Sequence, residues 1–239
     1  MSELRDRSIL VLGATGGLGR ELVALLAEHG ARLTLTARNA DALRELAPEG
    51  AATLAADLLD EATPRTAIAT ALMAHGSLDG VVNAAGAVAF GAVAETTDDT
   101  LETLWRLHVG APLSLLRAAT PALTESAEQG RTPFVLSLSG AAAEMPTAGL
   151  GVYSAVKAAQ SAAHQVAARE LRRSGIRVVD ARPGHTETEL SHHPLAGERP
   201  ALPIGYAPSA VAARLIAAIV DDERDLPASA FSELPKAEV

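Results

Sequence analysis

The sequence predicts an α/β fold in which helices cover both faces of a doubly wound parallel sheet, in a single domain over residues 1–239. Short runs of leucine and β-branched residues alternate with longer alanine-rich stretches, which is the pattern of repeated strand–helix–strand units. A cluster of glycines directly follows the first of these short runs. A chain of this length buries enough apolar surface to fold without disulfides or metal ions.

The composition excludes several classes of protein. The chain has no cysteine, which excludes disulfides, thiol catalysis and zinc–thiolate sites. Its net charge of −9 opposes nonspecific attraction to nucleic acid or to an anionic membrane surface. The N-terminal "MSELRDRSIL" lacks the long apolar core of a secretory signal, and no apolar run reaches the length of a membrane span. We therefore expect a cytoplasmic protein that binds neither nucleic acid nor membranes.

Six strands are predicted from the short apolar runs. They are Ser8–Leu12, Arg32–Thr36, Ala51–Ala56, Gly80–Asn83, Pro133–Ser137 and Ile176–Asp180. Helices fill the segments between them, and the helix ends carry the expected signals. Gly30 ends the first helix, Thr63 is a candidate N-cap before a proline, and Thr97 is a candidate N-cap before "DDTLETLWRL". Residues 188–208 are rich in proline, glycine and histidine and lack periodicity, which predicts a loop or lid over a substrate.

The turn "GATGGLG" after the first strand favours binding of a dinucleotide. Gly13, Gly17 and Gly19 let the backbone turn tightly and approach a pyrophosphate, and the free N–H groups at the helix start face the anion. Because these glycines lie at the first junction between a strand and a helix, a Rossmann-type cofactor site is favoured over an ordinary tight turn.

The charge at the end of the second strand bears on which cofactor is bound. Arg38 follows Thr36 and Ala37 there, and neither of those positions carries a carboxylate that could hold a ribose 2′-hydroxyl. A guanidinium at this place suits a 2′-phosphate, so NADP(H) is favoured over NAD(H). The alternative is that Arg38 is a solvated residue at a helix start.

The stretch "GVYSAVKAAQ" places Tyr153 and Lys157 four residues apart, on one face of a predicted helix. A phenol has an ordinary pKa near 10, and a nearby ammonium group stabilises the phenolate and lowers that pKa. The pair is therefore a candidate for proton transfer at neutral pH. The alternative is a packed tyrosine beside a solvated lysine, which occurs in many helices, and the spacing alone does not decide between the two.

Together, the glycine turn and the Tyr-x-x-x-Lys pair resemble the short-chain dehydrogenase/reductase family, and the resemblance covers nearly the whole chain. "GATGGLG" resembles the family's Thr-Gly-x-x-x-Gly-x-Gly turn, with Leu12 in place of the threonine. "ADLLD" resembles the segment that contacts adenine, and "VNAAG" the Asn-Asn-Ala-Gly element, with Ala84 in place of the second asparagine. "RPGHTET" resembles the Pro-Gly turn after the sixth strand.

This resemblance implies a cofactor site with an oxidoreductase chemistry. Pro183 and Gly184 would approach the nicotinamide, and Thr186 or Thr188 would bind its carboxamide or the diphosphate. The residues that the resemblance and the glycine turn assign to the cofactor are Gly13, Thr15, Gly17, Leu18, Gly19, Arg38, Asp57, Leu58, Asn83, Ala84, Gly86, Tyr153, Lys157, Pro183, Gly184, Thr186 and Thr188.

The resemblance also implies the catalytic roles. Tyr153 would be the general acid/base, and Lys157 would hold the nicotinamide ribose and lower the pKa of Tyr153. The family's catalytic serine is displaced, because its commonest spacing from Tyr153 reaches Gly140. Ser139 is the neighbouring strand-end hydroxyl that could reach the substrate oxygen, and we assign the role to it.

His108 aligns with the family's helix asparagine, which links the lysine to a water relay. Histidine also donates and accepts hydrogen bonds, and its pKa lies near neutrality. His108 could therefore replace that relay or alter its pH dependence. The alternative is that His108 packs beneath the site without a role in proton transfer.

Two further groups of polar residues carry weaker expectations. The loop residues His185, His192 and His193 lie near Glu187 and Glu189, but adjacent histidines in a flexible loop are poorly arranged for a metal, so we expect none and favour a substrate-facing role for one of them. The acidic residues of "GSLDGV" and "DDERDLP" are expected to be solvated.

The leading hypothesis is an NADP(H)-dependent oxidoreductase that interconverts a ketone or aldehyde and an alcohol on a small-molecule substrate. Ala84, His108 and Gly140 motivate an alternative, a cofactor-binding protein with little catalysis that acts as a redox-responsive partner. A third hypothesis, epimerisation, is disfavoured because a sizeable C-terminal substrate domain is missing. By the resemblance, "LETLWRLHVGAPLSLLRAATPAL" and the helix of Tyr153 would pack against another subunit in a homodimer or homotetramer; the alternative is burial within the monomer.

Overall fold

The computed structural model describes residues 3–238 and contains a seven-stranded sheet in the order β3-β2-β1-β4-β5-β6-β7. Every pair of neighbouring strands is parallel, and the order reverses between β1 and β4. This is the predicted doubly wound fold. In such sheets, ligands bind outside the carboxyl ends of the strands at the point of reversal.

The strands are β1 (Ser8–Leu12), β2 (Arg32–Ala37), β3 (Ala52–Ala55), β4 (Gly80–Asn83), β5 (Phe134–Leu138), β6 (Arg177–Ala181) and β7 (Asp225–Leu226). The α-helices are α1 (Gly17–Glu28), α2 (Ala40–Leu46), α3 (Thr63–His75), α4 (Asp98–Trp105), α5 (Ala111–Glu128), α6 (Gly151–Glu170) and α7 (Pro208–Val220). All six predicted strands are confirmed to within one residue at either end. The two-residue strand β7 was not predicted, because it is too short to show a period.

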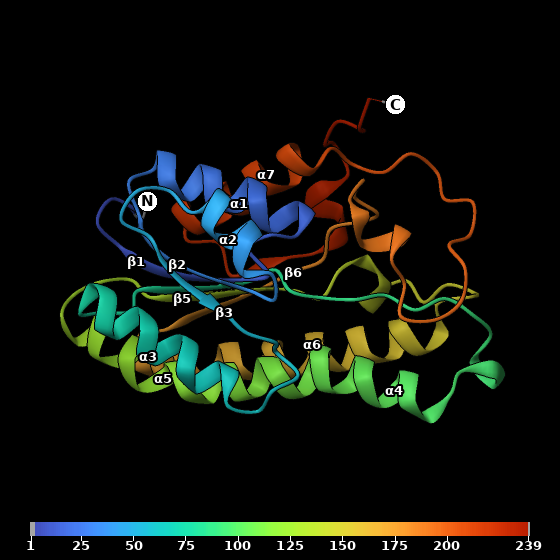
Figure 1. Cartoon of the computed structure of the whole chain (residues 1–239), viewed down its shortest axis with the longest axis horizontal. Coiled ribbons are helices and arrows are strands. Elements are labelled where there is room, and N and C mark those ends of the chain that lie inside the picture. The colour runs from blue at the N-terminus through green and yellow to red at the C-terminus, as the bar shows by residue number, and fades with distance from the viewer. Residues whose placement is uncertain (1–2, 239) are drawn as a thin grey trace.

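Helices cover both faces of the sheet: α1, α2 and α7 lie on one face, and α3, α5 and α6 on the other (Figure 1). Successive residues of a strand point to opposite faces, so each central strand contributes to two apolar layers. In β1, Ile9 and Val11 pack in the layer of α1 and α7, whereas Leu10 and Leu12 pack in the layer of α3 and α5. None of the described helices is long and apolar enough to cross a bilayer.

The helix caps agree with the sequence in part. The Thr97 hydroxyl accepts a hydrogen bond from the Thr100 amide, which confirms it as the N-cap of α4. The predicted cap at Thr63 is wrong, because Thr63 lies inside α3 and its hydroxyl donates to the Asp57 carbonyl at 2.6 Å. Asn39 caps α2 by accepting from two amides of the first turn.

The long amphipathic stretch after Thr97 is interrupted in the structure. Helix α4 ends at Trp105, a π-helical turn spans Arg106–Gly110, and α5 follows from Ala111. A π-helical turn inserts an additional residue into a helix, and such turns are frequent at functional sites. This one carries His108, whose side chain is 1% exposed.

Of the acidic residues that were expected to be solvated, Asp79 is buried, whereas those of "DDERDLP" are exposed or partly exposed. Asp79 is 1% exposed and accepts hydrogen bonds from the Ser8 amide at 2.9 Å and the Ser126 hydroxyl at 2.6 Å. It also forms an ion pair with Arg131 at 2.5 Å, so it joins the start of β1 to the end of α5. Three acidic residues of "DDERDLP" also bind arginines: Asp222 pairs with Arg177, Glu223 with Arg214, and Asp225 with Arg182.

Candidate active site

The predicted site residues lie at one edge of the sheet. All strands are parallel, so the segments that follow β1, β4, β5 and β6 emerge at the same edge, where the loop after β6 also lies (right side of Figure 1). This loop contains a short 3₁₀ turn, Glu189–His192. An isolated bridge between Thr186 and Tyr206 joins its two ends, and a second bridge joins Tyr206 to Lys236 near the C-terminus.

The glycine turn leaves no room for side chains. Gly13 has a φ of +71°, and a Cβ there would lie 2.6 Å from the backbone of Ala85. A Cβ on Gly19 would lie 2.1 Å from the Gly13 carbonyl oxygen, and one on Gly17 would lie 2.5 Å from the Thr188 side chain. Helix α1 starts here without a capping side chain, so its first amides have no side-chain partner. The turn therefore fits a diphosphate that approaches the backbone closely.

The remaining predicted cofactor residues lie around this turn. Arg38 is exposed at the end of β2. The Asn83 side chain accepts from the Ala85 amide at 3.2 Å, and the Asp57 carboxylate accepts from the Leu59 amide at 2.9 Å, so both shape the backbone locally. Arg20, which directly follows the glycines, donates to the Thr15 carbonyl at 2.9 Å and braces the turn.

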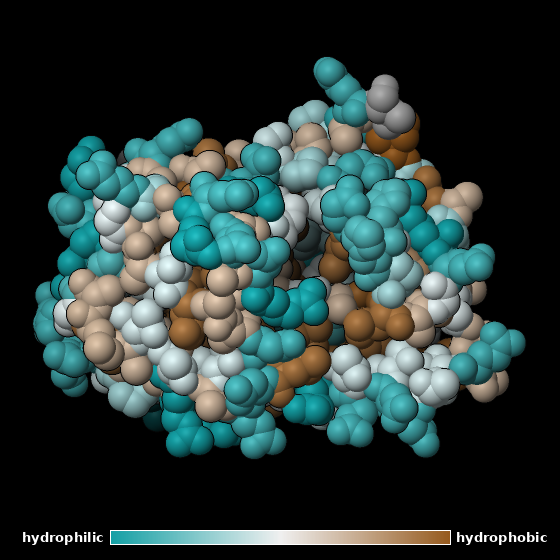
Figure 2. Space-filling model, in the orientation of Figure 1, coloured by the Kyte–Doolittle hydropathy of each residue, from teal (hydrophilic) through white to brown (hydrophobic). Residues whose placement is uncertain are grey.

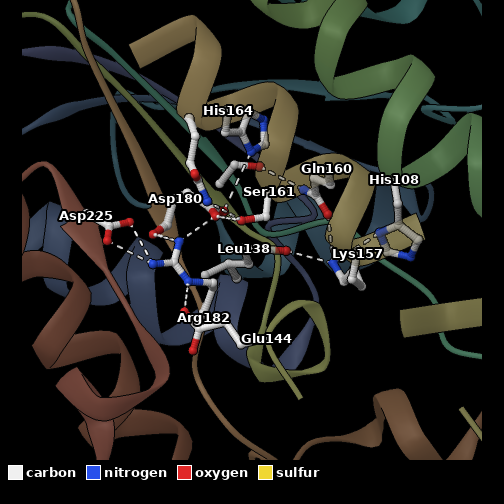
Figure 3. Close-up of polar contacts among 12 residues, drawn as sticks. His108, Leu138, Glu144, Lys157, Gln160, Ser161, His164, Asp180, Arg182 and Asp225 are labelled. Atoms are coloured by element: carbon white, nitrogen blue, oxygen red, sulfur yellow. Dashed lines mark hydrogen bonds and ion pairs between the residues drawn. The ribbon is translucent and has the colours of Figure 1, made fainter. Parts of the chain in front are cut away.

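The structure brings Tyr153, Lys157 and His108 together. Figure 3 shows the contact between Lys157 and His108. Lys157 Nζ lies 3.2 Å from His108 Nδ1 and 5.7 Å from the centre of the Tyr153 ring, and the two rings meet edge to face at 5.7 Å. His108 Nε2 lies 2.7 Å from the Ala87 carbonyl oxygen. These contacts assign a proton to Nε2 and leave Nδ1 as an acceptor for Lys157.

The electrostatics of this group differ from the expectation for Tyr153. Burial raises the pKa of Tyr153 above its ordinary value of 10, whereas burial lowers the pKa of Lys157 to about 7. Burial and the charge of Lys157 hold the pKa of His108 well below its ordinary range. The expected lowering of the Tyr153 pKa is therefore not found in the protein alone. The physical reason is that burial disfavours the phenolate of Tyr153, while the Lys157 ammonium is directed to other acceptors.

Two of those acceptors were missed by the sequence analysis. Lys157 Nζ donates to the Leu138 carbonyl at 2.7 Å and to Gln160 Oε1 at 3.0 Å. Gln160 in turn donates to the Ser137 hydroxyl at 3.1 Å, so the end of β5 positions the lysine. The available signal was helical spacing, because Gln160 follows Lys157 by three residues and shares its face of α6.

Ser139 is not part of this group. It is fully buried, its hydroxyl has no hydrogen-bond partner in residues 3–238, and it lies close to Asp180, whose pKa is held below its ordinary value by His164 and Ser161 against the effect of burial. The next residue, Gly140, is partly exposed, has a φ of +77°, and has only the Pro183 carbonyl oxygen, at 3.7 Å, near the position of a Cβ. The assignment of Ser139 to the substrate stays a prediction that this burial does not support.

The Pro183–Gly184 turn after β6 is packed against Tyr206, which lies later in the chain. The ring of Tyr206 lies against Gly184, where a Cβ would be 3.0 Å from it, and the Thr186 hydroxyl donates to the Gly184 carbonyl at 3.1 Å. Thr188 lies on Gly17, so the loop contacts the glycine turn directly. The contact with Tyr206 was not predicted, because it joins segments distant in the sequence.

A cavity of about 170 Å³ opens beside Tyr153. Its wall comes from the segments after β4, before α6 and after β6, and includes Phe90, Thr97 and Gly197. Figure 2 shows apolar side chains around a hollow beside the loops at this end of the molecule. The large apolar side chains that are exposed on these loops are Val93, Met145, Leu190, Leu195 and Ile204.

The histidines of the loop after β6 pair with single carboxylates. His185 lies 3.2 Å from Glu187, which also contacts Arg199, and His193 lies 3.3 Å from Glu189 at the surface. Over residues 3–238, no three or more histidine or acidic side chains are arranged to hold a metal ion.

Comparison with known proteins identifies the family. A model described as short chain dehydrogenase matches residues 7–198. The chain is 31% identical over 198 residues to dehydrogenase/reductase SDR family member 7B of Mus musculus; this match covers 79% of the chain but only 60% of the relative's length. The chain belongs to the short-chain dehydrogenase family. Its class is therefore that of the NAD(P)-dependent dehydrogenases and reductases.

Solved structures show the same fold. A short chain dehydrogenase from Burkholderia cenocepacia J2315 in complex with NADP has a TM-score of 0.80 at 25% identity, over 97% of this chain and all (100%) of that one. A 3-ketoacyl-(acyl-carrier-protein) reductase from Brucella melitensis complexed with NADH has a TM-score of 0.83 at 23% identity, over 95% of this chain and 99% of that one.

Proposed function

We propose that the protein is an NADP(H)-dependent oxidoreductase that interconverts a ketone or aldehyde and an alcohol, with Tyr153 as the general acid/base. The observation that carries this proposal is the placement of Tyr153 and Lys157 beside His108, at the sheet edge that also holds the glycine turn. When bound, a nicotinamide dinucleotide supplies or accepts the hydride.

Different residues of the chain would bind different parts of this cofactor. The start of α1 and the glycine turn would hold the diphosphate, because the backbone is accessible there and the helix end is positive. Arg38 is exposed and forms no ion pair with any residue in the range 3–238, so its guanidinium is free for a 2′-phosphate. This supports NADP(H) over NAD(H), and the same guanidinium would have no partner on NAD(H).

The proton chemistry follows from the burial of the site. A raised pKa keeps the phenol of Tyr153 protonated at neutral pH, ready to give its proton to a carbonyl oxygen in the reductive direction. Lys157 would donate hydrogen bonds to the ribose hydroxyls of the cofactor. These hydrogen bonds would favour the charged ammonium form of Lys157. His108, as a neutral imidazole, accepts from Lys157 and donates to the Ala87 carbonyl, at the position that the resemblance gives to the family's asparagine.

The test is the variant Tyr153→Phe, because it removes the transferable proton and leaves the ring. We expect turnover of simple ketones and aldehydes to be lost, while NADPH still binds with an affinity within about threefold of the wild type, measured by quenching and energy transfer in fluorescence titrations. The wild type should bind NADPH more tightly than NADH. Retained turnover in Tyr153→Phe would remove the assigned mechanism.

One observation favours the alternative of a cofactor-binding protein with little catalysis. Gly140 stands where the family's serine is expected, and the hydroxyl of Ser139 is buried beside Asp180, so no serine is seen to assist Tyr153 at the substrate oxygen. Screening carbonyl compounds with NADPH and alcohols with NADP⁺ separates the two hypotheses. Saturable turnover of any simple carbonyl removes the alternative.

We further propose that the chain acts as a single domain in the cytoplasm, as a homodimer or homotetramer. The support for an oligomer is a set of large apolar side chains exposed on the outer helices α4, α5 and α6: Leu101, Trp105, Leu113 and Val166. Apolar surface of this kind marks protein–protein contacts.

A further inference from the structure

An ion network lies directly behind the Pro183–Gly184 turn and is centred on Arg182 (Figure 3). The Arg182 side chain is 4% exposed and meets three carboxylates. It donates to Asp180 at 2.7 Å, to both oxygens of Asp225 at 2.8 and 2.9 Å, and, through Nε, to Glu144. One guanidinium therefore joins the end of β6, the edge strand β7 and the segment between β5 and α6.

Glu144 is the member of this network that lies nearest in the sequence to the helix of Tyr153. It lies in residues 139–150, which lead from the end of β5 to the helix of Tyr153. The first part of this segment is held by its backbone, because the amides of Gly140 and Ala141 donate to the carbonyls of Ala181 and Pro183. Beyond Ala141, the contact that ties the segment to the turn is the one from Glu144 to Arg182.

The second oxygen of Glu144 is also in use. It accepts a hydrogen bond from the Ala228 amide at 3.2 Å, so the side chain bridges Arg182 and the segment after β7. The residues that follow Glu144, from Met145 to Gly149, are exposed. Their next anchor is the backbone contact of Gly149 with Gly91, on the far side of the cavity beside Tyr153. The start of this segment, Ala141–Ala143, packs on α6, and the contacts of Glu144 and Gly149 hold the exposed residues between them at either end.

We propose that Glu144 is a positioning residue: by binding Arg182 it fixes residues 141–150 against the Pro183–Gly184 turn and so sets the width of the substrate site. This inference rests on the proposed function, since it concerns the substrate side of the same site. Glu144 has no contact with the glycine turn or with Lys157. Its loss should weaken binding of the carbonyl substrate and leave binding of the cofactor unchanged.

The charges around Arg182 determine which variant can test the positioning role of Glu144. Removing Arg182 would leave three carboxylates without their shared cation, and the fold itself would be at risk. Glu144→Gln keeps the shape and the acceptor oxygen but removes one charge. Arg182 then still has Asp180 and Asp225 as partners, so no buried charge is left alone. The side chain of Glu144 is also 36% exposed, which limits the effect on stability.

The experiment compares Glu144→Gln with the control Glu223→Gln. Glu223 is 35% exposed and binds both terminal nitrogens of Arg214, at 2.7 and 2.8 Å, so it is matched in exposure and chemistry. For Glu144→Gln we expect the KM for a carbonyl substrate to rise at least fivefold, with kcat and the affinity for NADPH within twofold of the wild type. In the NADPH complex, amide hydrogen exchange of residues 141–150 should become faster. The control should change none of these quantities.

The outcomes separate the two proposals. If the wild type turns over carbonyl substrates and Glu144→Gln has the same KM and the same exchange in residues 141–150, the positioning role is wrong and the proposed function stands. Equal changes in Glu144→Gln and the control would also overturn the role, because they would reflect a general loss of stability. If the wild type shows no turnover, the proposed function is wrong, and unchanged exchange would then overturn the positioning role by itself.

Discussion

At the scale of single residues, burial sets the chemistry of the site more than proximity does. Lys157 is only 5% exposed, and its ammonium is surrounded by the Leu138 carbonyl, Gln160 and His108. Residue spacing predicted that Lys157 and Tyr153 would meet. It did not predict that both would be desolvated, which shifts each pKa toward the neutral form of the group.

The lowered pKa of Lys157 has a consequence for stability. Burial holds this pKa at about 7, below its ordinary value of 10.5, so the unfolded chain binds more protons than the folded one between these values. The destabilising effect, about 5 kcal/mol, is fully present below pH 7 and disappears as the pH rises toward 10.5. The stability of Lys157→Met relative to the wild type should therefore be greater by about 3 kcal/mol at pH 6 than at pH 9.

Urea unfolding at pH 6 and pH 9 measures this difference. The variant loses the hydrogen bonds of Lys157 at both pH values, so their contribution cancels when the two values are subtracted. The control is Lys236→Met, which removes an exposed lysine instead of the buried one. An effect of Lys157→Met that does not depend on pH would show that Lys157 keeps an ordinary pKa in the folded protein.

At the scale of elements, two short irregular segments place the functional groups. The π-helical turn between α4 and α5 directs His108 to Lys157, and the glycine turn opens the start of α1. The glycine pattern was readable from the sequence because each glycine answers a local steric need. The π-helical turn was not, since the residues around it continue the apolar pattern of one long helix.

The glycine turn gives a prediction for two alanine variants. In Gly19→Ala the new Cβ would lie 2.1 Å from the Gly13 carbonyl oxygen, so the turn must open. We expect the free energy of unfolding to fall by about 1–3 kcal/mol and NADPH affinity to fall at least tenfold. In Gly110→Ala the nearest atom would be 4.0 Å away, and the helical backbone favours alanine by about 0.5–1 kcal/mol.

Thermal unfolding and NADPH titration of both variants check this prediction. The control variant should be as stable as the wild type or more stable, with unchanged NADPH affinity. A Gly19→Ala protein that binds NADPH normally would contradict the assignment of this turn to the cofactor.

At the scale of the whole molecule, buried ionic contacts join segments that are far apart in the chain. Asp79 links the start of β1 to the end of α5 on one side of the sheet. Arg182 links β6 and β7 to the segment before α6. In both cases a carboxylate that the sequence analysis placed in solvent, Asp79 or Asp225, has an arginine partner.

Asp79→Ala tests the first of these links. It removes the acceptor for the Ser8 amide and the Ser126 hydroxyl and leaves Arg131, which is 29% exposed, without its carboxylate. We expect the free energy of unfolding, measured in urea, to fall by about 3 kcal/mol. The control is Asp41→Ala, whose partner Arg44 is exposed, and it should cost less than about 1 kcal/mol. Equal effects of the two variants would contradict the structural role of Asp79.

The sequence by itself determined the strand positions, the glycine turn and the pairing of Tyr153 with Lys157, because each rests on a local period, a local steric need or a fixed helical spacing. Only the tertiary structure decided that Ser139 is buried beside Asp180, that Gln160 holds Lys157, and that Glu144 reaches Arg182. These contacts depend on which segments the sheet brings together and on how much water is excluded between them. The alternation of residues along a strand does not contain that information.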